Sequence, residues 1–200
     1  MVCVRPPLPP ERQLVSRLVL LSDCGTLEAL FGPRVRELLV NLQGLGGNPY
    51  SAGNTLVAAD GPAQAAIAAA VGSTVRAMRH AGLRTAGQLA RWYGVAVLGR
   101  LPRLAWAGRS LAPLAADDFY LSHIAVMPTR QGAGVGTALL RAVEDRARRL
   151  GSPRLVLDVD ENNEAARAFY DRRGYRECSA VRIDLGRRGC FRLLRLARPL

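Results

Sequence analysis

The chain contains no lysine: all 28 of its basic residues are arginines. A phosphate-binding P-loop, which needs Gly-Lys-Ser/Thr, is therefore excluded. Its four cysteines include no C-x-x-C pair and it has only two histidines, so we expect reduced thiols and no metal site. No run of 18 apolar residues occurs, which excludes a helical membrane span, and the first residues lack the apolar block of a signal peptide. We therefore expect a cytoplasmic protein that does not bind membranes.

The formal net charge of +12 suggests a nucleic-acid partner. The arginines are dispersed, however, and aromatic residues make up only 6% of the chain. A GC-rich coding bias explains the exclusion of lysine more simply than selection for phosphate binding. An RNA-associated protein remains an alternative, and RNA retention with a steep salt dependence would be its sign. A positive surface also suits an anionic cofactor or an acidic substrate.

The most informative stretch is a predicted strand, a glycine-rich turn and a predicted helix in succession. Residues 119–126 are apolar and rich in β-branched and aromatic side chains, which predicts a strand. The turn Gln131–Gly136 follows, and residues 137–150 carry apolar side chains at helical spacing. The first turn of a helix leaves N–H groups unpaired with a partial positive charge, and glycine lets a phosphate approach them. The dinucleotide fingerprint does not fit, because Thr137 occupies the position of its third glycine.

A second motif lies downstream. Asn163, Ala166, Phe169-Tyr170 and Gly174-Tyr175 follow a strand-like segment at residues 155–159. Together with Q-x-x-G-x-G in the turn, this N-x-x-A-x-x-hydrophobic-Y-x-x-x-G-aromatic pattern resembles the GNAT acyltransferase superfamily from about residue 120 to 175. The resemblance implies one domain over residues 1–200, with an α/β (α+β) GNAT fold in which helices flank a mixed, mostly antiparallel sheet.

The resemblance also implies how acetyl-CoA is held and used. Main-chain groups of the fourth strand would bind the pantetheine arm, the glycine-rich turn would bind the diphosphate, and the helix after the second motif would add contacts. The implied cofactor-binding residues are Ile124, Ala125, Val126, Gln131, Gly132, Ala133, Gly134, Val135, Gly136, Thr137, Asn163 and Ala166. Asn163 also suits a helix N-cap. Tyr170 would be the general acid, since an unperturbed phenol is protonated at neutral pH and can donate to a departing thiolate.

The general base stays open among Asp118, Ser122, His123 and Asp158. Asp118 and Ser122 share one face of the expected strand with Tyr120, whereas His123 lies on the other face unless a bulge turns it. His123 has a suitable unperturbed pKa.

The rest of the chain fits the same layout. Expected strands are Val2–Arg5, Thr55–Ala59, Ala63–Val71, Leu155–Val159, Tyr175–Leu185 and Cys190–Ala197, and expected helices are Glu11–Leu21 and Arg34–Leu42. The alanine-rich segment at 63–71 favours helix by propensity. The family layout favours a strand there, and small side chains would suit a strand covered closely on both faces.

Residues 73–118 exceed the short turn that the family often has before the fourth strand, so we expect a helical insertion near the acceptor side. Two groups of side chains have two interpretations, as substrate contacts or as packing and turn residues: Trp92, Tyr93 and Trp106 in this segment, and Asn48, Tyr50 and Ser51 in the loop at 44–53.

The sequence thus predicts an acetyl-CoA-dependent N-acetyltransferase that acts on a primary amine of a small molecule, protein or peptide by direct attack in a ternary complex. The alternative within the same fold is a catalytically inactive module that binds acyl-CoA or a partner. Many members of the family are dimers, so a homodimer is compatible with the sequence. The acceptor itself stays undefined.

Overall fold

The computed structural model of the protein describes residues 2–23, 25–61, 64–94, 96, 114–184 and 190–200. One seven-stranded sheet, in the order β1-β2-β3-β4-β5-β7-β6, organises the described residues. The strands are β1 (Cys3–Arg5), β2 (Thr55–Ala59), β3 (Ala66–Thr74), β4 (Phe119–Val126), β5 (Arg154–Asp160), β6 (Arg176–Asp184) and β7 (Cys190–Pro199). Neighbouring strands are antiparallel except β4 and β5, which are parallel. The expected mixed, mostly antiparallel sheet is therefore confirmed.

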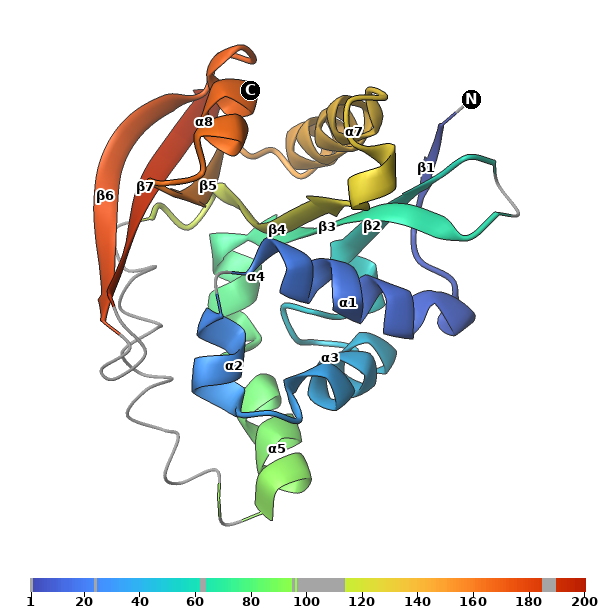
Figure 1. Cartoon of the computed structure of the whole chain (residues 1–200). Helices are drawn as coiled ribbons and strands as arrows, with labels where there is room; N and C mark the ends of the chain where they lie inside the picture. Colours follow the sequence, from blue (N-terminus) through green and yellow to red (C-terminus); the bar gives the residue numbers. More distant parts are fainter. Residues whose placement is uncertain (1, 24, 62–63, 95, 97–113, 185–189) are drawn as a thin grey trace.

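Helices cover both faces of this sheet (Figure 1). On one face lie α1 (Arg12–Ser22), α2 (Thr26–Phe31), α3 (Val35–Gly44) and α5 (Gly82–Tyr93); on the other lie α7 (Val135–Arg149) and α8 (Glu164–Asp171). The short helix α4 (Val75–His80) follows β3, and 3₁₀ turns occupy Pro9–Glu11, Ala52–Asn54 and Pro128–Arg130. Among the described residues, no helix is both long and apolar enough to cross a membrane.

The alanine-rich segment is a strand because it is buried between the two helical layers. Ala68 and Ala70 pack in the core beneath α7, whereas Ala69 and Val71 pack in the core beneath α1 and α3. Small side chains let both layers approach the sheet closely, so tertiary packing overrides helix propensity here.

A bulge between β3 and β4 shapes the centre of the sheet. Val71 pairs with His123 but Gly72 pairs with Leu121, so Ser122 is the extra residue on β4. A Cβ atom at Gly72 would lie 2.7 Å from the Phe119 ring and 2.9 Å from the Tyr120 carbonyl oxygen. Glycine is therefore required at this crossing. The bulge also shifts which side chains of β4 face each helical layer.

The segment expected as an insertion at 73–118 needs a correction at its start. Ser73 and Thr74 belong to β3, because they pair with Tyr120 and Phe119 on β4. The helices α4 and α5 then follow, as the sequence indicated. After α5, the segment expected as an insertion is described only at residues 94, 96 and 114–118, and Trp106 lies outside the described residues.

Candidate functional site

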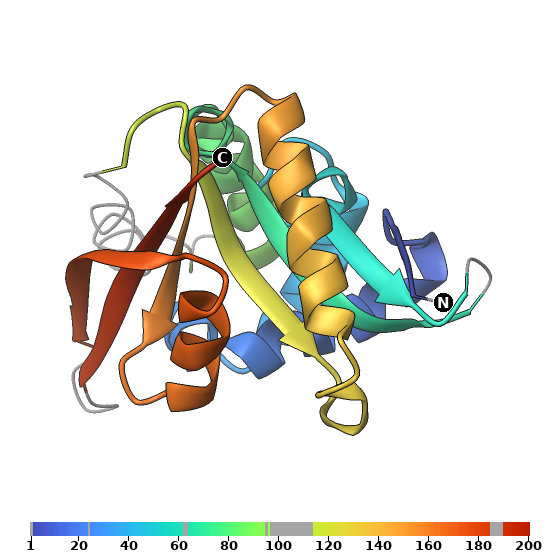
Figure 2. The same cartoon turned by 90° about the horizontal axis from the view of Figure 1, so that it is seen from above.

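The parallel strands β4 and β5 separate toward their carboxyl ends (Figure 2). They pair only where Phe119–Leu121 meets Leu155–Leu157. Beyond this point the two strands, both fully described, make no further pairs with each other, while β5 stays paired with β7 as far as Asp160. The sheet therefore has an internal opening in which backbone groups of β4 lack a strand partner.

Register shows which backbone groups face this opening. The Met127 N–H donates to the Ile67 carbonyl at 2.9 Å, and residues in an antiparallel pair alternate between bonded and non-bonded positions. The main-chain groups of Ile124 and Val126 thus point away from β3, toward the opening. Consistently, the Val126 carbonyl accepts a hydrogen bond from the Gln131 side chain at 3.3 Å. The same alternation directs the main chain of Ala125 to β3, so the expectation that all three residues offer their backbone is wrong for Ala125.

The glycine-rich turn lies between β4 and α7 and is open on its outer side. Gly132 and Gly134 both have φ of 79°, where a side chain is strained, and a Cβ atom at either position would meet nothing within 4 Å. Helix α7 begins at Val135, two residues earlier than expected, with Gly134 as its N-cap. Its fully described first turn contains no acidic residue. Free N–H groups, the helix dipole and an uncrowded approach fit a bound diphosphate.

Helix α8 packs its aromatic face beside this turn. Asn163 caps it as expected, accepting a hydrogen bond from the Ala166 N–H at 3.0 Å. Phe169 is the residue that reaches the turn, since a Cβ atom at Gly136 would lie 3.7 Å from its ring and 3.5 Å from Val126.

Tyr170 is 6% exposed and belongs to the same core as Ile124 and Val126. Its ring meets the rings of Phe169 and Tyr175 edge-on at 5.2 and 5.5 Å. Burial raises the pKa of the Tyr170 phenol, although the charge of Arg173 opposes the shift. The hydroxyl is consequently protonated at physiological pH.

Two of the four candidate bases are held in ion pairs. Asp118 is fully buried and binds the Arg154 guanidinium at 2.7 and 2.9 Å, at the paired end of β4 and β5. Asp158 binds the buried Arg195 through two contacts of 2.8 Å and accepts the Tyr120 hydroxyl at 3.0 Å. Both carboxylates are thus occupied in stabilising the sheet.

His123 lies on the face of the sheet covered by α1, because the bulge at Ser122 turns it there. Its Nδ1 is 3.3 Å from the Ser22 hydroxyl and its Nε2 is 3.5 Å from the Tyr50 hydroxyl. Burial lowers the pKa of His123 to about 4, so the imidazole is neutral at physiological pH. Burial likewise raises the pKa of Tyr50, with a further contribution from Asp23.

The sequence did not reveal the Tyr120–Asp158–Arg195 network on this face. Its one signal was an arginine within the apolar run of β7, but the pairing of Arg195 with Asp158 depends on the strand register. Of the loop residues, Tyr50 does reach the site. Asn48 instead holds the loop, donating to the carbonyls of Leu42 and Leu45 at 2.9 Å each.

The other aromatic candidates pack away from the opening. Trp92 packs against the core beneath α1 and α3. The guanidinium carbon of Arg34 lies over the Trp92 ring, 5.2 Å from the ring centroid. The Tyr93 hydroxyl donates to the Phe31 carbonyl at 2.6 Å. Both residues attach α5 to α2 and α3, which agrees with the packing interpretation.

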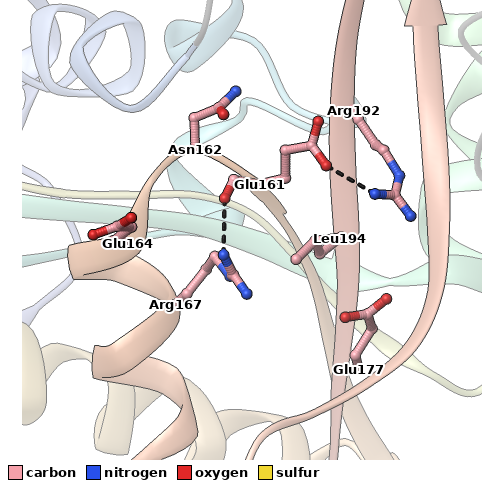
Figure 3. A pocket seen from close by; sticks show the side chains of 7 residues that line it. All are labelled: Glu161, Asn162, Glu164, Arg167, Glu177, Arg192 and Leu194. Atoms are coloured by element: carbon pink, nitrogen blue, oxygen red, sulfur yellow. Dashed lines mark hydrogen bonds and ion pairs between the residues drawn. The ribbon is translucent and has the colours of Figure 1, made fainter.

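Two surface pockets lie near α8 and neither is lined by Tyr170, Ile124 or Val126. Figure 3 shows the first, beside the start of α8, where Arg192 pairs with Glu161 at 2.9 Å and Arg167 donates to the Glu161 carbonyl. The second lies between α7 and the end of α8. Within the part of the chain that the structure describes, no cluster of three or more metal-binding side chains occurs.

Comparison with known proteins agrees with this geometry. Residues 77–175 match the sequence model of the acetyltransferase (GNAT) family. The chain carries a GNAT acetyltransferase domain. In sequence, the chain is 34% identical over 56 residues to "N-alpha-acetyltransferase 30" of Schizosaccharomyces pombe. That match covers 28% of this chain and 37% of the relative, so the chain spans little more than a third of the length of this curated protein.

Solved GNAT structures share the fold over nearly the whole chain. An N-acetyltransferase from Staphylococcus aureus Mu50 superposes with a TM-score of 0.67 at 16% identity, covering 98% of this chain and all of the other. The NatC complex, solved with Gag peptide and CoA, contains a chain that superposes with a TM-score of 0.59 at 13% identity, covering 100% and 98%. At these identities the likeness establishes the GNAT fold alone.

Proposed function

We propose that the protein is an acetyl-CoA-dependent N-acetyltransferase that transfers the acetyl group directly to a primary amine. One observation supports this most strongly: the opening between β4 and β5 exposes the main-chain groups of Ile124 and Val126 beside an uncrowded glycine turn. A strand-like pantetheine arm can pair with the former while a diphosphate meets the latter.

The cofactor contacts follow from these positions. The main chains of Ile124 and Val126 bind the pantetheine arm, and the amides from Gly132 to Thr137 bind the diphosphate. Gln131 already hydrogen-bonds the Val126 carbonyl, so its side chain must move or share that acceptor when the arm binds. A main-chain N–H at the opening also stabilises the negative charge that develops on the thioester oxygen.

Tyr170 supplies the proton for the leaving group. The amine nitrogen forms a bond to the acetyl carbon, the carbon–sulfur bond breaks, and the phenol of Tyr170 protonates the departing thiolate. Because burial raises its pKa, the Tyr170 phenol keeps its proton at neutral pH and is available as a donor while the carbon–sulfur bond breaks.

On the acceptor side, we propose that His123 takes the proton from the amine and that the Tyr50 hydroxyl orients it. Asp118 and Asp158 are bound to arginines, whereas the neutral His123 has the hydroxyl groups of Ser22 and Tyr50 as its side-chain hydrogen-bond partners among the described residues. With a pKa of about 4, His123 is a weak base. It suits an amine that is already partly unprotonated at neutral pH.

This weak base favours an α-amine as the acceptor. An N-terminal amine has a pKa of about 8, compared with about 10.4 for a lysine side chain. The curated relative is named an N-alpha-acetyltransferase, and the NatC structure contains a peptide. We therefore propose the N-terminus of a peptide or protein as the acceptor class.

A coupled binding and turnover experiment tests the proposal. Calorimetry measures acetyl-CoA binding, and thiol release is followed with three acceptors: a lysine-free peptide with a free N-terminus, a lysine-containing peptide whose N-terminus is acetylated, and a diamine. We expect thiol release with the first only. Folded protein that binds no acetyl-CoA would contradict the whole proposal. Binding without thiol release on any amine would favour the inactive, acyl-CoA-binding alternative.

A further inference from the structure

The pocket between α7 and the end of α8 is strongly positive. Its charged lining consists of Arg141, Arg172, Arg173, Arg198 and Glu144. Glu144 is 4% exposed and already accepts hydrogen bonds from the Tyr175 hydroxyl at 2.9 Å and from Arg198 at 2.8 Å. One occupied carboxylate therefore faces four guanidinium groups, and three positive charges stay uncompensated by the lining.

The four arginines divide into two pairs. Arg198 and Arg173 are held by the protein: Arg173 donates to the Phe169 carbonyl at 2.6 Å and to the Thr137 hydroxyl, and it lies over the Phe169 ring. Arg141 and Arg172 are exposed and have no hydrogen-bond or ion-pair partner among the described residues. The pocket thus combines two anchored guanidiniums with two that are available to a ligand.

Arg173 lies in a crowded positive environment and keeps one hydrogen-bond donor without a partner among the described residues. Burial lowers the pKa of Arg173, and the charges of Arg172 and Arg141 lower it further. The buried Nε atom of Arg173 has no hydrogen-bond partner in the described part of the chain. A compact anion offsets the repulsion and offers the exposed guanidinium groups acceptor oxygens in the geometry that they bind best.

We propose that this pocket binds a phosphomonoester, and that the group it takes is the 3′-phosphate on the ribose of coenzyme A. The inference rests on the proposed function, because it requires the diphosphate to lie at the glycine turn. Thr137 connects the two places: it is in the first turn of α7, and Arg173 donates to its hydroxyl. Arg141 lies one turn further, about 6 Å along the helix. The diphosphate and the 3′-phosphate of coenzyme A are attached to the same ribose, so one molecule can fill both sites.

Binding of coenzyme A and of 3′-dephospho-coenzyme A tests this assignment by calorimetry at fixed, near-physiological salt. Three proteins are compared: the wild type, the pocket variant Arg141→Gln/Arg172→Gln, and the control variant Arg36→Gln/Arg149→Gln. The control loses the same two charges from exposed helix positions outside the pocket. A third ligand, inorganic phosphate, is added in competition with each nucleotide.

We expect the wild type to bind coenzyme A about 10- to 100-fold more tightly than the dephospho form, as for one or two charged hydrogen bonds. The pocket variant should reduce this ratio to about threefold or less, whereas the control keeps the wild-type ratio. Phosphate should compete with coenzyme A more strongly than with its dephospho form.

Each other result has a defined meaning. Equal affinity of the wild type for both nucleotides, or an unchanged ratio in the pocket variant, overturns the pocket assignment and leaves the acetyltransferase proposal standing. If the protein binds free phosphate but binds both nucleotides equally well, the assignment of the pocket to coenzyme A is overturned. Folded wild type that binds neither nucleotide overturns the proposed function itself.

Discussion

The two faces of β4 are built in different ways. On the α7 face, the opening, the glycine turn and Tyr170 come from one stretch of about 50 residues, and much of the proposed cofactor binding uses backbone groups. On the α1 face, side chains from α1, the loop before β2, β4, β5 and β7 meet; Ser22 and His123 are 101 positions apart. The comparison teaches that the proposed cofactor site, made of main chain, is encoded locally, whereas the proposed acceptor site, made of side chains, depends on how distant elements pack.

The largest predicted effect concerns the stability of the α1 face. Asp158→Ala should destabilise the protein by about 3–5 kcal/mol, because it leaves the 2%-exposed Arg195 in the sheet without its carboxylate. The matched variant Asp117→Ala removes an exposed partner of Arg76 and should cost at most about 1 kcal/mol. Urea unfolding of both variants measures the difference. Equal, small losses would show that the Asp158 network does not hold this face together.

The next effect concerns the α7 face. Tyr170→Phe should lower kcat about 10²-fold and leave the affinity for acetyl-CoA nearly unchanged, since it removes the proposed proton donor and keeps the packed ring. Tyr93→Phe serves as control, because the Tyr93 hydroxyl binds the Phe31 carbonyl outside the opening. Steady-state kinetics with a saturating peptide acceptor decide the matter. Full turnover in Tyr170→Phe would remove this residue from the mechanism.

The same comparison explains what the sequence could and could not predict. The glycine turn and Asn163 were identified with their local geometry, because dihedral preference and capping act over a few residues. The strand β3 could be predicted only from the family layout, because the alanines of 66–70 favour helix by propensity and form a strand only between two layers of helices. His123 could not be assigned to a face without the bulge, and the ion pairs of Asp118 and Asp158 depend on strand register.

The third effect is the pH dependence of stability that His123 contributes on the α1 face. Burial lowers the pKa of His123 to about 4, compared with about 6.5 in the unfolded chain, so the unfolded state binds more protons between these values. This contribution to stability is complete above about pH 6.5 and is lost as the pH falls toward 4. In the wild type it adds up to about 1.4 kcal/mol per pH unit to the slope of unfolding free energy in this window.

His123→Gln should remove that part of the slope, and the difference between the two proteins isolates it from Asp23 and Tyr50, which lie beside the site in both. The same variant should reduce kcat about tenfold with an α-amine acceptor if His123 accepts the proton. Parallel stability curves from pH 4 to 6.5 would show that the imidazole is not buried as a neutral group, and unchanged turnover would transfer the base role to solvent.

The smallest effect tests the backbone character of the α7 face. Gly134 has φ of 79° at the N-cap of α7 and open space where a Cβ atom would stand. Gly134→Ala should therefore act through conformation and not through a clash: a left-handed alanine costs about 1–2 kcal/mol. If the turn relaxes to avoid that cost, the first-turn N–H groups no longer point toward the diphosphate and acetyl-CoA affinity falls about tenfold. Gly87→Ala on α5, which also meets nothing within 4 Å but has no positive φ, should leave affinity unchanged. Full affinity in a Gly134→Ala protein that is destabilised by about 1–2 kcal/mol would mean that the turn keeps its conformation. Full affinity without that loss of stability would mean that the turn has relaxed and its amides do not hold the diphosphate, and the contrast between the two faces of β4 would disappear.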